Sequence, residues 1–266
     1  MFKENRQFWL YIVGAIAAFL ILFYALAKYT GRDNLLPQTD EANSDVIVVA
    51  PTTVPTAVTF TGIPENNLNT DLDYFARVQT NFGQLTLDLF EKSAPNTVNN
   101  FAFLATKDFY DGTKFHRLIP NILLQGGSRN TLNSDPADDK YGGPGYVIND
   151  EVNWDSLDFA PELRAELTRL GYKPVAAVAS KDVAKYRLAM AGTGPNSAGS
   201  QFFIILGEGQ GPLIQNLRGK HTIFAEVIAG QDIIDSLNEI SVDDPESNSP
   251  RPLQDIIIED IEIFTK

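Results

Sequence analysis

The chain lacks cysteine altogether, and it has only two histidines, His116 and His221. Without cysteine, disulfides, thiolate nucleophiles and thiolate metal sites are all excluded. Two histidines are too few for a histidine-rich metal centre. We expect an activity that needs neither a metal nor another cofactor. The lack of cysteine does not identify the compartment, because many extracytoplasmic proteins also fold without disulfides.

Basic side chains are scarce relative to acidic ones. The 266 residues include 21 Lys and Arg against 34 Asp and Glu, which gives a formal net charge of −13. A surface of this charge repels phosphate backbones, so nucleic acid is not an expected partner. The length and the hydrophobic fraction of 44% suit one main domain with appended segments. We find no internal repeat and expect a monomer.

Three motifs of well-known chemistry are incomplete in this chain. Residues 207–211 (GEGQG) follow a predicted strand, but Pro212 stands where a dinucleotide-binding motif needs glycine. Ser197 lies in the string PNSAG, which lacks the first glycine of a nucleophile elbow. The acidic pairs at 138–139 and 243–244 do not have the spacing of a calcium loop.

One long hydrophobic run is present. Residues 8–27 (FWLYIVGAIAAFLILFYALA) carry no charge, and a helix of this length crosses the roughly 30 Å core of a bilayer. Trp9 and Tyr29 lie near its ends, as aromatic residues do at membrane interfaces. We predict a transmembrane anchor over residues 1–30 that contacts the lipid bilayer through residues 8–27, with the remainder of the chain on the extracytoplasmic side.

Two other interpretations of this run stay open. Ala25-Leu26-Ala27 has the small-x-small form that precedes a signal-peptide cleavage site, although the run exceeds the roughly 7 to 15 residues of a signal core. A buried core helix is disfavoured, because no polar residue interrupts the run to give it a solvent face.

The next segment, residues 31–71, is rich in Thr, Pro, Asn and Asp, which is typical of an extended linker. The short run at 46–50 (VIVVA) can instead be a strand that joins the main domain. We place that domain over residues 72–266.

The main domain begins with a hairpin and a helix. Residues 74–80 and 85–90 are apolar-alternating runs separated by a polar, glycine-containing turn. In the predicted helix that follows, Ser93 is the expected cap and Pro95 lies in the first turn. Residues 98, 101, 102 and 105 have the three-and-four spacing of one buried helix face.

Further short runs predict more strands. They lie at residues 115–119, 188–191, 201–206, 222–227 and 255–264, and a second helix is expected at 231–238. Many short strands with two helices, in no strict alternation, favour a mainly β fold and a closed or nearly closed antiparallel barrel over a doubly wound sheet.

Three strings in this domain resemble the cyclophilin family. They are FHRLIPNILLQGG at 115–127, MAGTGPNSAGSQFFI at 190–204 and GKHTIFAEVIAGQDIIDSL from residue 219. The first hairpin and helix (GQLTLDLFEKSAPNTVNNF) also resemble the family, and the order of the strings is the family's own. The resemblance covers residue 75 to the C-terminus. It implies a closed, eight-stranded antiparallel barrel capped by two helices, and a membrane-anchored member of bacterial type.

The resemblance implies peptidyl-prolyl cis-trans isomerase activity on proline-containing polypeptides, with Arg117 and Gln125 in catalysis. It also implies an apolar proline pocket, a name kept below for Leu123, Phe203, Leu217 and His221 with Ile122 at its edge. Ala191, Gly192 and Gln201 match residues of the neighbouring groove. Each also has a plain structural role open to it, since Phe203 and Leu217 suit any core and Arg117 suits a surface ion pair.

The chain departs from the family at three positions. Ile122 stands where the family usually has an aromatic residue, Asn216 where a tryptophan is frequent, and Gly192 where an asparagine is typical. The proline pocket has therefore lost aromatic surface on two sides. We expect weaker binding or altered specificity, including poor inhibition by the family's cyclic peptide ligand.

The required chemistry agrees with the residues present. Prolyl isomerisation breaks no covalent bond, and its barrier of about 18 to 20 kcal/mol reflects lost double-bond character in the twisted amide. An apolar pocket and a cation near the proline nitrogen therefore suffice, without a nucleophile or a metal. The main hypothesis is a foldase for exported proteins. The alternative is a non-catalytic tethered module that binds proline-containing segments of a partner.

An insertion at about 155–186 separates the first two strings further than a minimal family member requires. Residues 161–171 in it predict a short helix that ends at Gly171. The segment leads into the Ala191 groove, so one hypothesis is a flap that selects substrates, and the other is a surface decoration without effect on activity.

Overall fold

The computed structural model describes residues 58–69, 71–209 and 211–266. The predicted anchor and the linker up to residue 57 lie outside this described part. No helix among the described residues is long and apolar enough to cross a bilayer. The family match and the structure both give a mainly β domain, as the sequence predicted.

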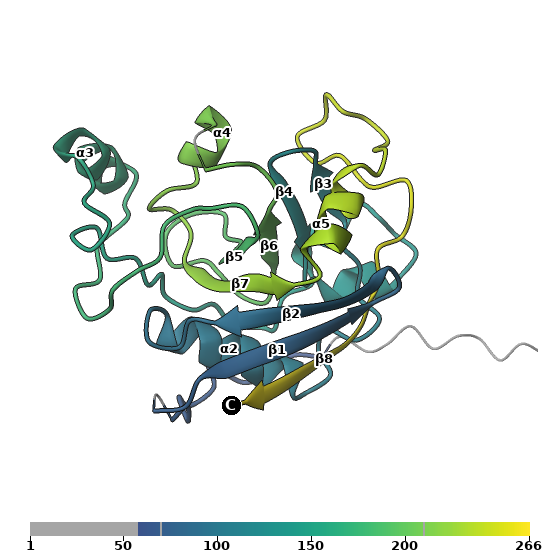
Figure 1. The fold of residues 1–266 in the computed structure, drawn as a ribbon, viewed down its shortest axis with the longest axis horizontal. Coiled ribbons are helices and arrows are strands. Elements are labelled where there is room, and N and C mark those ends of the chain that lie inside the picture. Colours follow the sequence, from purple (N-terminus) through teal and green to yellow (C-terminus); the bar gives the residue numbers. More distant parts are fainter. Residues whose placement is uncertain (1–57, 70, 210) are drawn as a thin grey trace, which may run out of the picture. The chain divides into compact units, whose positions relative to one another are not determined.

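A single eight-stranded antiparallel sheet forms the domain (Figure 1). Its spatial order is β3-β4-β6-β5-β7-β2-β1-β8. The strands are β1 Tyr74–Thr80, β2 Gly83–Leu89, β3 Arg117–Ile119, β4 Leu123–Gly126, β5 Arg187–Met190, β6 Phe202–Ile205, β7 Ile223–Ala229 and β8 Ile258–Thr265. The predicted β1–β2 hairpin is confirmed. Strand β4 was not predicted, because its four residues, LLQG, show no alternation.

The sheet is open, which corrects the prediction of a closed barrel. Strands β3 and β8 are its two edges and do not pair with each other. The segment before β3 approaches the start of β8 through one isolated bridge, between Lys114 and Ile257, and through neighbouring backbone hydrogen bonds, such as that from the N–H of Phe115 to the carbonyl of Ile256. β3 is three residues long, and the N–H of Leu118 in it donates to the carbonyl of Pro250 in a loop.

Two helices pack against the sheet, in agreement with the sequence. Helix α2 (Pro95–Ala105) lies against β7 and β8, and helix α5 (Gln231–Asn238) lies against β2. Two further helices, α3 (Pro161–Arg169) and α4 (Pro212–Gln215), and the 3-10 turns Arg129–Leu132 and Asp139–Tyr141 lie in connections between strands.

Ser93 does not cap α2, contrary to the prediction. The helix has no side-chain cap from its own N-terminal residues. The carboxylate of the buried Glu151 takes that place from a distant loop and accepts hydrogen bonds from the backbone N–H groups of Asn96 and Thr97, at 3.1 and 2.8 Å. A carboxylate at this end also complements the helix dipole.

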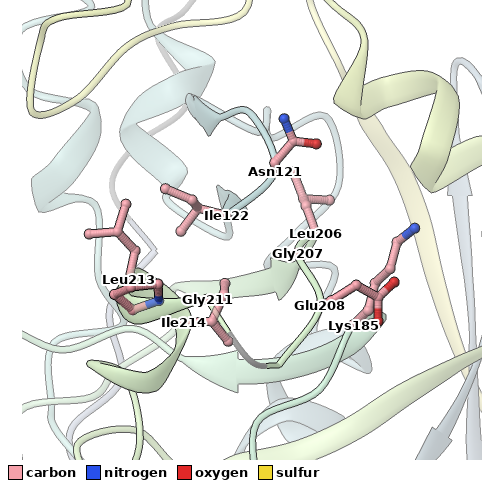
Figure 2. Close-up of a pocket in the computed structure, with 10 residues that line it drawn as sticks. Asn121, Ile122, Lys185, Leu206, Gly207, Glu208, Gly211, Leu213 and Ile214 are labelled. Carbon is pink, nitrogen blue, oxygen red and sulfur yellow. The ribbon is translucent and has the colours of Figure 1, made fainter.

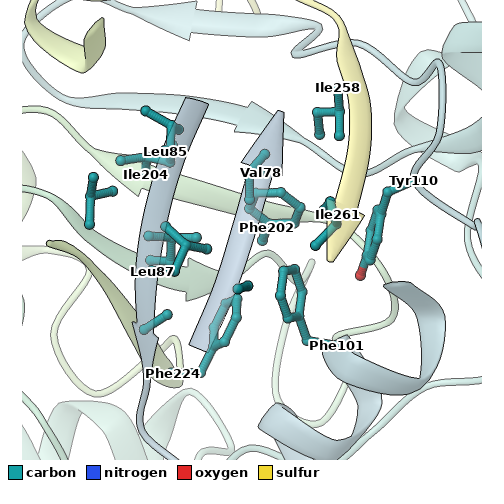
Figure 3. Close-up of a cluster of buried hydrophobic side chains, with 14 of the residues drawn as sticks. Val78, Leu85, Leu87, Phe101, Tyr110, Phe202, Ile204, Phe224, Ile258 and Ile261 are labelled. Atoms are coloured by element: carbon teal, nitrogen blue, oxygen red, sulfur yellow. The ribbon is translucent and has the colours of Figure 1, made fainter. Parts of the chain in front are cut away.

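The main core lies between the sheet and α2 (Figure 3). Phe101 of α2 stands perpendicular to Phe202 of β6 with 5.7 Å between ring centroids, and it lies 5.2 Å from the ring of Phe224 of β7. Edge-to-face aromatic packing of this kind fixes α2 over the centre of the sheet. Strands β4 and β6 are thereby held at a defined position, and they carry much of the candidate site.

The end of the predicted linker packs on the domain. The ring of Phe60 lies edge-to-face on that of Phe103, with 5.0 Å between centroids. The backbone N–H of Phe60 donates to the carbonyl of Pro144 at 2.9 Å. Val58 and Leu68 also contact the main core. The packed domain therefore extends on its N-terminal side at least to Val58 rather than beginning at residue 72.

Candidate active site

All ten predicted site residues line one groove, which we call the central groove. It has a volume of about 650 Å³ and is open to solvent. The residues come from β3, β4 and the turn between them, from β6, from the segments after β5 and α4, and from the loop before β7. They are Arg117, Ile122, Leu123, Gln125, Ala191, Gly192, Gln201, Phe203, Leu217 and His221. Their assigned roles stay predictions, but their positions satisfy the requirement that they act on one bound molecule.

A chain of hydrogen bonds fixes Arg117 in the groove. Arg117 of β3 is directly opposite Gln125 of β4, and its Nη1 donates to Gln125 Oε1 at 3.0 Å. Gln125 Nε2 donates to Gln201 Oε1 at 3.0 Å, and Gln201 Nε2 donates to the carbonyl of Lys140 at 2.9 Å. Each amide is thereby oriented by its neighbour, so the guanidinium position is determined by the sheet register.

A second contact holds the other side of the guanidinium. Arg117 Nε donates to the carbonyl of Asn248, at 3.1 Å, in the loop before β8. Burial lowers the pKa of Arg117 from its ordinary value, yet a guanidinium stays protonated at neutral pH. The structure therefore presents a positioned cation beside an apolar surface.

The proline pocket is that apolar surface. Leu123 of β4 and Phe203 of β6 are buried and pack with Ile122 and Leu217. The ring of His221 stands edge-to-face on Phe203, with 5.2 Å between centroids. The sequence did not identify Val183, which packs into the same cluster from the insertion.

His221 is neutral under ordinary conditions. Its Nδ1–H donates to the carbonyl of Met190 at 3.0 Å, which fixes the tautomer. Burial lowers the pKa of His221 to about 4. The imidazole therefore acts as part of the apolar wall at neutral pH and not as a second cation. His116 lies outside the central groove and lines a separate small cavity.

The groove continues from the proline pocket past Ala191 and Gly192. The N–H of Ala191 donates to the carbonyl of Gln201 at 2.9 Å. A Cβ atom on Gly192 would lie 2.8 Å from Ser197 Oγ, which is already bonded to Gly194. The space for a side chain at this position is therefore taken, which gives a local reason for glycine in place of the family's asparagine.

Other residues of the groove were not identified as site residues from the sequence. Tyr141, Val147 and Leu213 are more than half exposed and line its rim, and Asn248 lines the end near Arg117. No local pattern separates them from ordinary loop residues. An exposed large apolar side chain is informative only when the fold places it beside a cavity.

Comparisons with known proteins agree with this geometry. Residues 75–263 match the family model for "Cyclophilin type peptidyl-prolyl cis-trans isomerase/CLD". The chain is 36% identical over 205 residues to the probable peptidyl-prolyl cis-trans isomerase A of Mycobacterium bovis, covering 71% of this chain and 91% of that protein. It is 34% identical over 209 residues to isomerase B of Streptomyces anulatus, covering 72% and 97%.

Among solved structures, a Cryptosporidium parvum cyclophilin type isomerase superposes with a TM-score of 0.53 at 27% identity, covering 73% of this chain and 99% of that one. A second structure of that protein, determined in the presence of the dipeptide Ala-Pro, has the same TM-score at 28% identity, covering 72% and 99%.

Proposed function

The chain belongs to the cyclophilin family of peptidyl-prolyl cis-trans isomerases and is such an isomerase, and from this premise we propose that it accelerates Xaa-Pro isomerisation in proteins that fold outside the cytoplasm. The observation that carries the catalytic part is the hydrogen-bonded series Arg117–Gln125–Gln201 beside the proline pocket. The uncatalysed reaction takes tens of seconds, which is slow enough to delay folding.

The proposed mechanism uses no covalent chemistry. The proline ring enters the proline pocket, where burial of its apolar surface supplies binding energy. As the amide twists, the proline nitrogen loses conjugation and becomes a better acceptor. Arg117 donates to it, and this bond strengthens only in the twisted state, so it lowers the barrier rather than merely tightening binding.

Gln125 has the role of a positioning residue in this mechanism. Its Oε1 holds Arg117 Nη1, and its Nε2 is held in turn by Gln201, so the guanidinium does not have to reorganise when the amide twists. The groove past Ala191, Gly192 and Gln201 would hold the substrate backbone on one side of the proline.

The test is an isomerisation assay of the full chain on an Ala-Pro-containing peptide, with Arg117→Ala and Arg117→Lys. We expect Arg117→Ala to lower kcat/KM by about 10²- to 10³-fold, the usual cost of removing one transition-state donor. Arg117→Lys should recover little, because an ammonium cannot reproduce the planar fork. Arg77→Ala is the control, since Arg77 pairs with Glu262 on the outer face of β1.

An unaffected Arg117→Ala enzyme would remove Arg117 from the mechanism. A folded wild-type chain without any activity would instead support the alternative of a tethered module that binds proline-containing segments. Far-ultraviolet circular dichroism on the same samples distinguishes that outcome from misfolding.

For the location, we propose that residues 8–27 anchor the chain in the membrane and that the isomerase domain lies on the extracytoplasmic side. Support comes from the length and the uncharged composition of that run. In a bacterial host the full chain should sediment with membranes and resist alkaline extraction. The domain should be digested by protease added to spheroplasts but not to intact cells.

N-terminal sequencing of the mature protein separates the two export routes. A chain that begins at Met1 is a signal anchor, whereas a chain that begins just after Ala27 is a cleaved and released protein. Recovery of the domain in the cytoplasmic fraction would contradict both.

A further inference from the structure

A second hollow lies next to the central groove (Figure 2). We call it the side pocket, and its volume is about 440 Å³. The isomerase mechanism described above gives this pocket no role. It is lined by Asn121, Ile122, Lys185, Leu206, Gly207, Glu208, Gly211, Pro212, Leu213 and Ile214.

The side pocket is continuous with the central groove. Ile122 and Leu213 line both of them, so these two side chains form the ridge between the two spaces. Leu213 is 60% exposed, so the ridge lies at the protein surface. A chain bound in the groove can therefore cross the ridge without leaving the protein surface.

The sheet register places the side pocket in line with the groove. Along β6, Gln201 precedes the strand, Phe203 of the proline pocket lies within it, and Leu206 and Gly207 follow it. At about 3.3 Å per residue, Leu206 is roughly 10 Å beyond Phe203, on the side away from Gln201. An extended substrate with its proline over Phe203 reaches the side pocket about three residues from the proline.

The walls of the side pocket are held in place by the fold. A Cβ atom on Gly207 would lie 2.2 Å from the carbonyl oxygen of Asn121, so only glycine permits this approach of the two turns. Asn121 is held by Asn238 of α5 through two hydrogen bonds of 2.7 and 3.0 Å. The pocket therefore exists before a ligand arrives, which reduces the entropic cost of binding.

The chemistry of the side pocket is apolar at one side and charged at the other. Figure 2 shows Ile122 and Leu213 on one side, and Lys185 and Glu208 extending from the opposite side. The ammonium of Lys185 is neutralised by Asp235 at 3.0 Å. The carboxylate of Glu208 is exposed and forms no ion pair within residues 58–69, 71–209 and 211–266. The unbalanced charge of the side pocket is therefore negative.

We propose that the side pocket is a second binding site for the polypeptide substrate, which takes a long side chain with an apolar stem and a basic end about three residues from the proline. The inference rests on the proposed isomerase function and adds a preference to it. The stem packs on Ile122 and Leu213, and the cation of a substrate lysine or arginine lies near Glu208. Long basic side chains bury their stems while the charged end stays wet, which suits a pocket open on one side.

The test compares peptides that differ at one position. Lysine, norleucine or alanine is placed three residues after the proline in one series and three residues before it in another, and kcat/KM of the full chain is measured by NMR exchange at low salt. In the series whose flank crosses the ridge, we expect norleucine to exceed alanine severalfold. Lysine should exceed norleucine by about two- to fivefold, the size expected of one partly exposed ion pair.

Two matched variants separate a local effect from the net charge of the chain. Glu208→Gln should abolish the advantage of lysine over norleucine and leave the alanine peptide unchanged. Glu259→Gln removes the same charge from an exposed position in β8 and should change nothing. If the advantage of lysine over norleucine fell equally in both variants, the cause would be general attraction to a negatively charged chain, and the proposal would be overturned.

Equal kcat/KM for all three side chains in both series would also overturn it. Activity on the alanine peptide shows in that case that the isomerase function stands and that only the second binding site fails.

Discussion

At the scale of single residues, the position of each polar site residue is set by the neighbours that hydrogen-bond to it. Arg117 is fixed by Gln125 and Asn248, and Gln125 is fixed by Gln201. Next to Leu217, the side chain of Asn216 is exposed and accepts a hydrogen bond from Lys220 at 2.7 Å. The Asn216 side of the groove is therefore the less defined one.

Restoring an aromatic ring at this position should strengthen binding. We expect Asn216→Trp to raise the affinity for the family's cyclic peptide ligand about tenfold or more, because an indole adds a large apolar surface to the rim of the proline pocket. A fluorescence titration measures the effect. Asn216→Ala is the control, since it removes the bond to Lys220 without adding a ring. Tight inhibition of the unmodified chain would contradict the expectation of weak binding.

At the scale of elements, α2 depends on a residue that is distant in sequence. Glu151 also accepts from Asn96 Nδ2 at 2.9 Å and from Thr97 Oγ1 at 2.7 Å, besides the two backbone groups. Four donors on one buried carboxylate tie the loop before the insertion to the N-terminus of α2. This contact therefore joins the helix that fixes the core to the segment that leads to the groove.

Removal of this carboxylate should destabilise the whole domain. We expect Glu151→Ala to lower the free energy of unfolding by about 3 kcal/mol, because buried donors lose a charged acceptor and the helix loses its cap. Glu151→Gln should cost less, since an amide oxygen still accepts. Urea denaturation measures both variants. Glu162→Gln, an exposed acidic residue in the first turn of α3, should have little effect; a comparable loss there would refute a special role for Glu151.

The insertion has a different position from the one that a flap requires. Within its described residues, 155–186, none lines the central groove, and only Lys185 lines the side pocket. Its Phe159 and Leu167 form a small core together with Trp154, which precedes it. Asp182 accepts two hydrogen bonds from Arg218, at 2.9 and 2.5 Å, and the guanidinium of Arg218 lies 4.8 Å from the ring of Phe159.

These contacts support the wall of the proline pocket from behind, because Arg218 directly follows Leu217. We expect Asp182→Ala to raise KM about three- to tenfold with kcat nearly unchanged, since Leu217 loses its support while Arg117 is untouched. A bidentate pair between partly buried groups is worth more than an exposed one.

The matched control for this variant lies in the same insertion. Asp155 pairs with Arg164 at 2.6 Å and is 77% exposed, so Asp155→Ala should leave KM unchanged. An equal rise of KM in both variants would show a general loss of stability instead of a local effect on the pocket.

At the scale of the whole molecule, the two histidines link stability to pH. Burial lowers the pKa of both His116 and His221 to about 4, whereas an unfolded histidine titrates near 6.5. Below pH 6.5 the two histidines are protonated in the unfolded chain but stay neutral in the folded chain. The contribution of the histidines to the free energy of unfolding is therefore fully present above pH 6.5. It is lost as the pH falls towards 4, by on the order of 3 kcal/mol for each histidine.

Other groups oppose part of this loss. Burial raises the pKa of Asp88, Asp139 and Asp150, so protonation of these carboxyls at low pH favours the folded state. The contribution of one histidine is best measured as a difference. The free energy of unfolding of the wild type minus that of His116→Gln should fall by about 2 kcal/mol between pH 7 and pH 4.5.

NMR titration gives an independent check of the same prediction. Both imidazoles should stay neutral down to about pH 4, and kcat/KM should be flat between pH 6 and 8, because His221 remains neutral in that range. An imidazole that titrates near pH 6.5 in the folded chain would contradict it.

The local elements and most of the site were predictable from the sequence alone. The hairpin of β1 and β2 and helices α2 and α5 depend on period-two and period-3.6 patterns and on turn residues close in the chain. The strings that carry Arg117 and Gln125 were identified by their resemblance to the cyclophilin family. The ten residues that the family resemblance pointed to all line one groove.

Only the tertiary structure decided how the distant parts meet. Glu151 rather than Ser93 caps α2, the sheet stays open at β3 and β8, and Val183 packs under the proline pocket. The ridge that Ile122 shares with Leu213 also joins residues that lie far apart in the chain. Periodicity reports which face of an element is buried but not which partner covers it, because that choice depends on the register and on the closure of long loops.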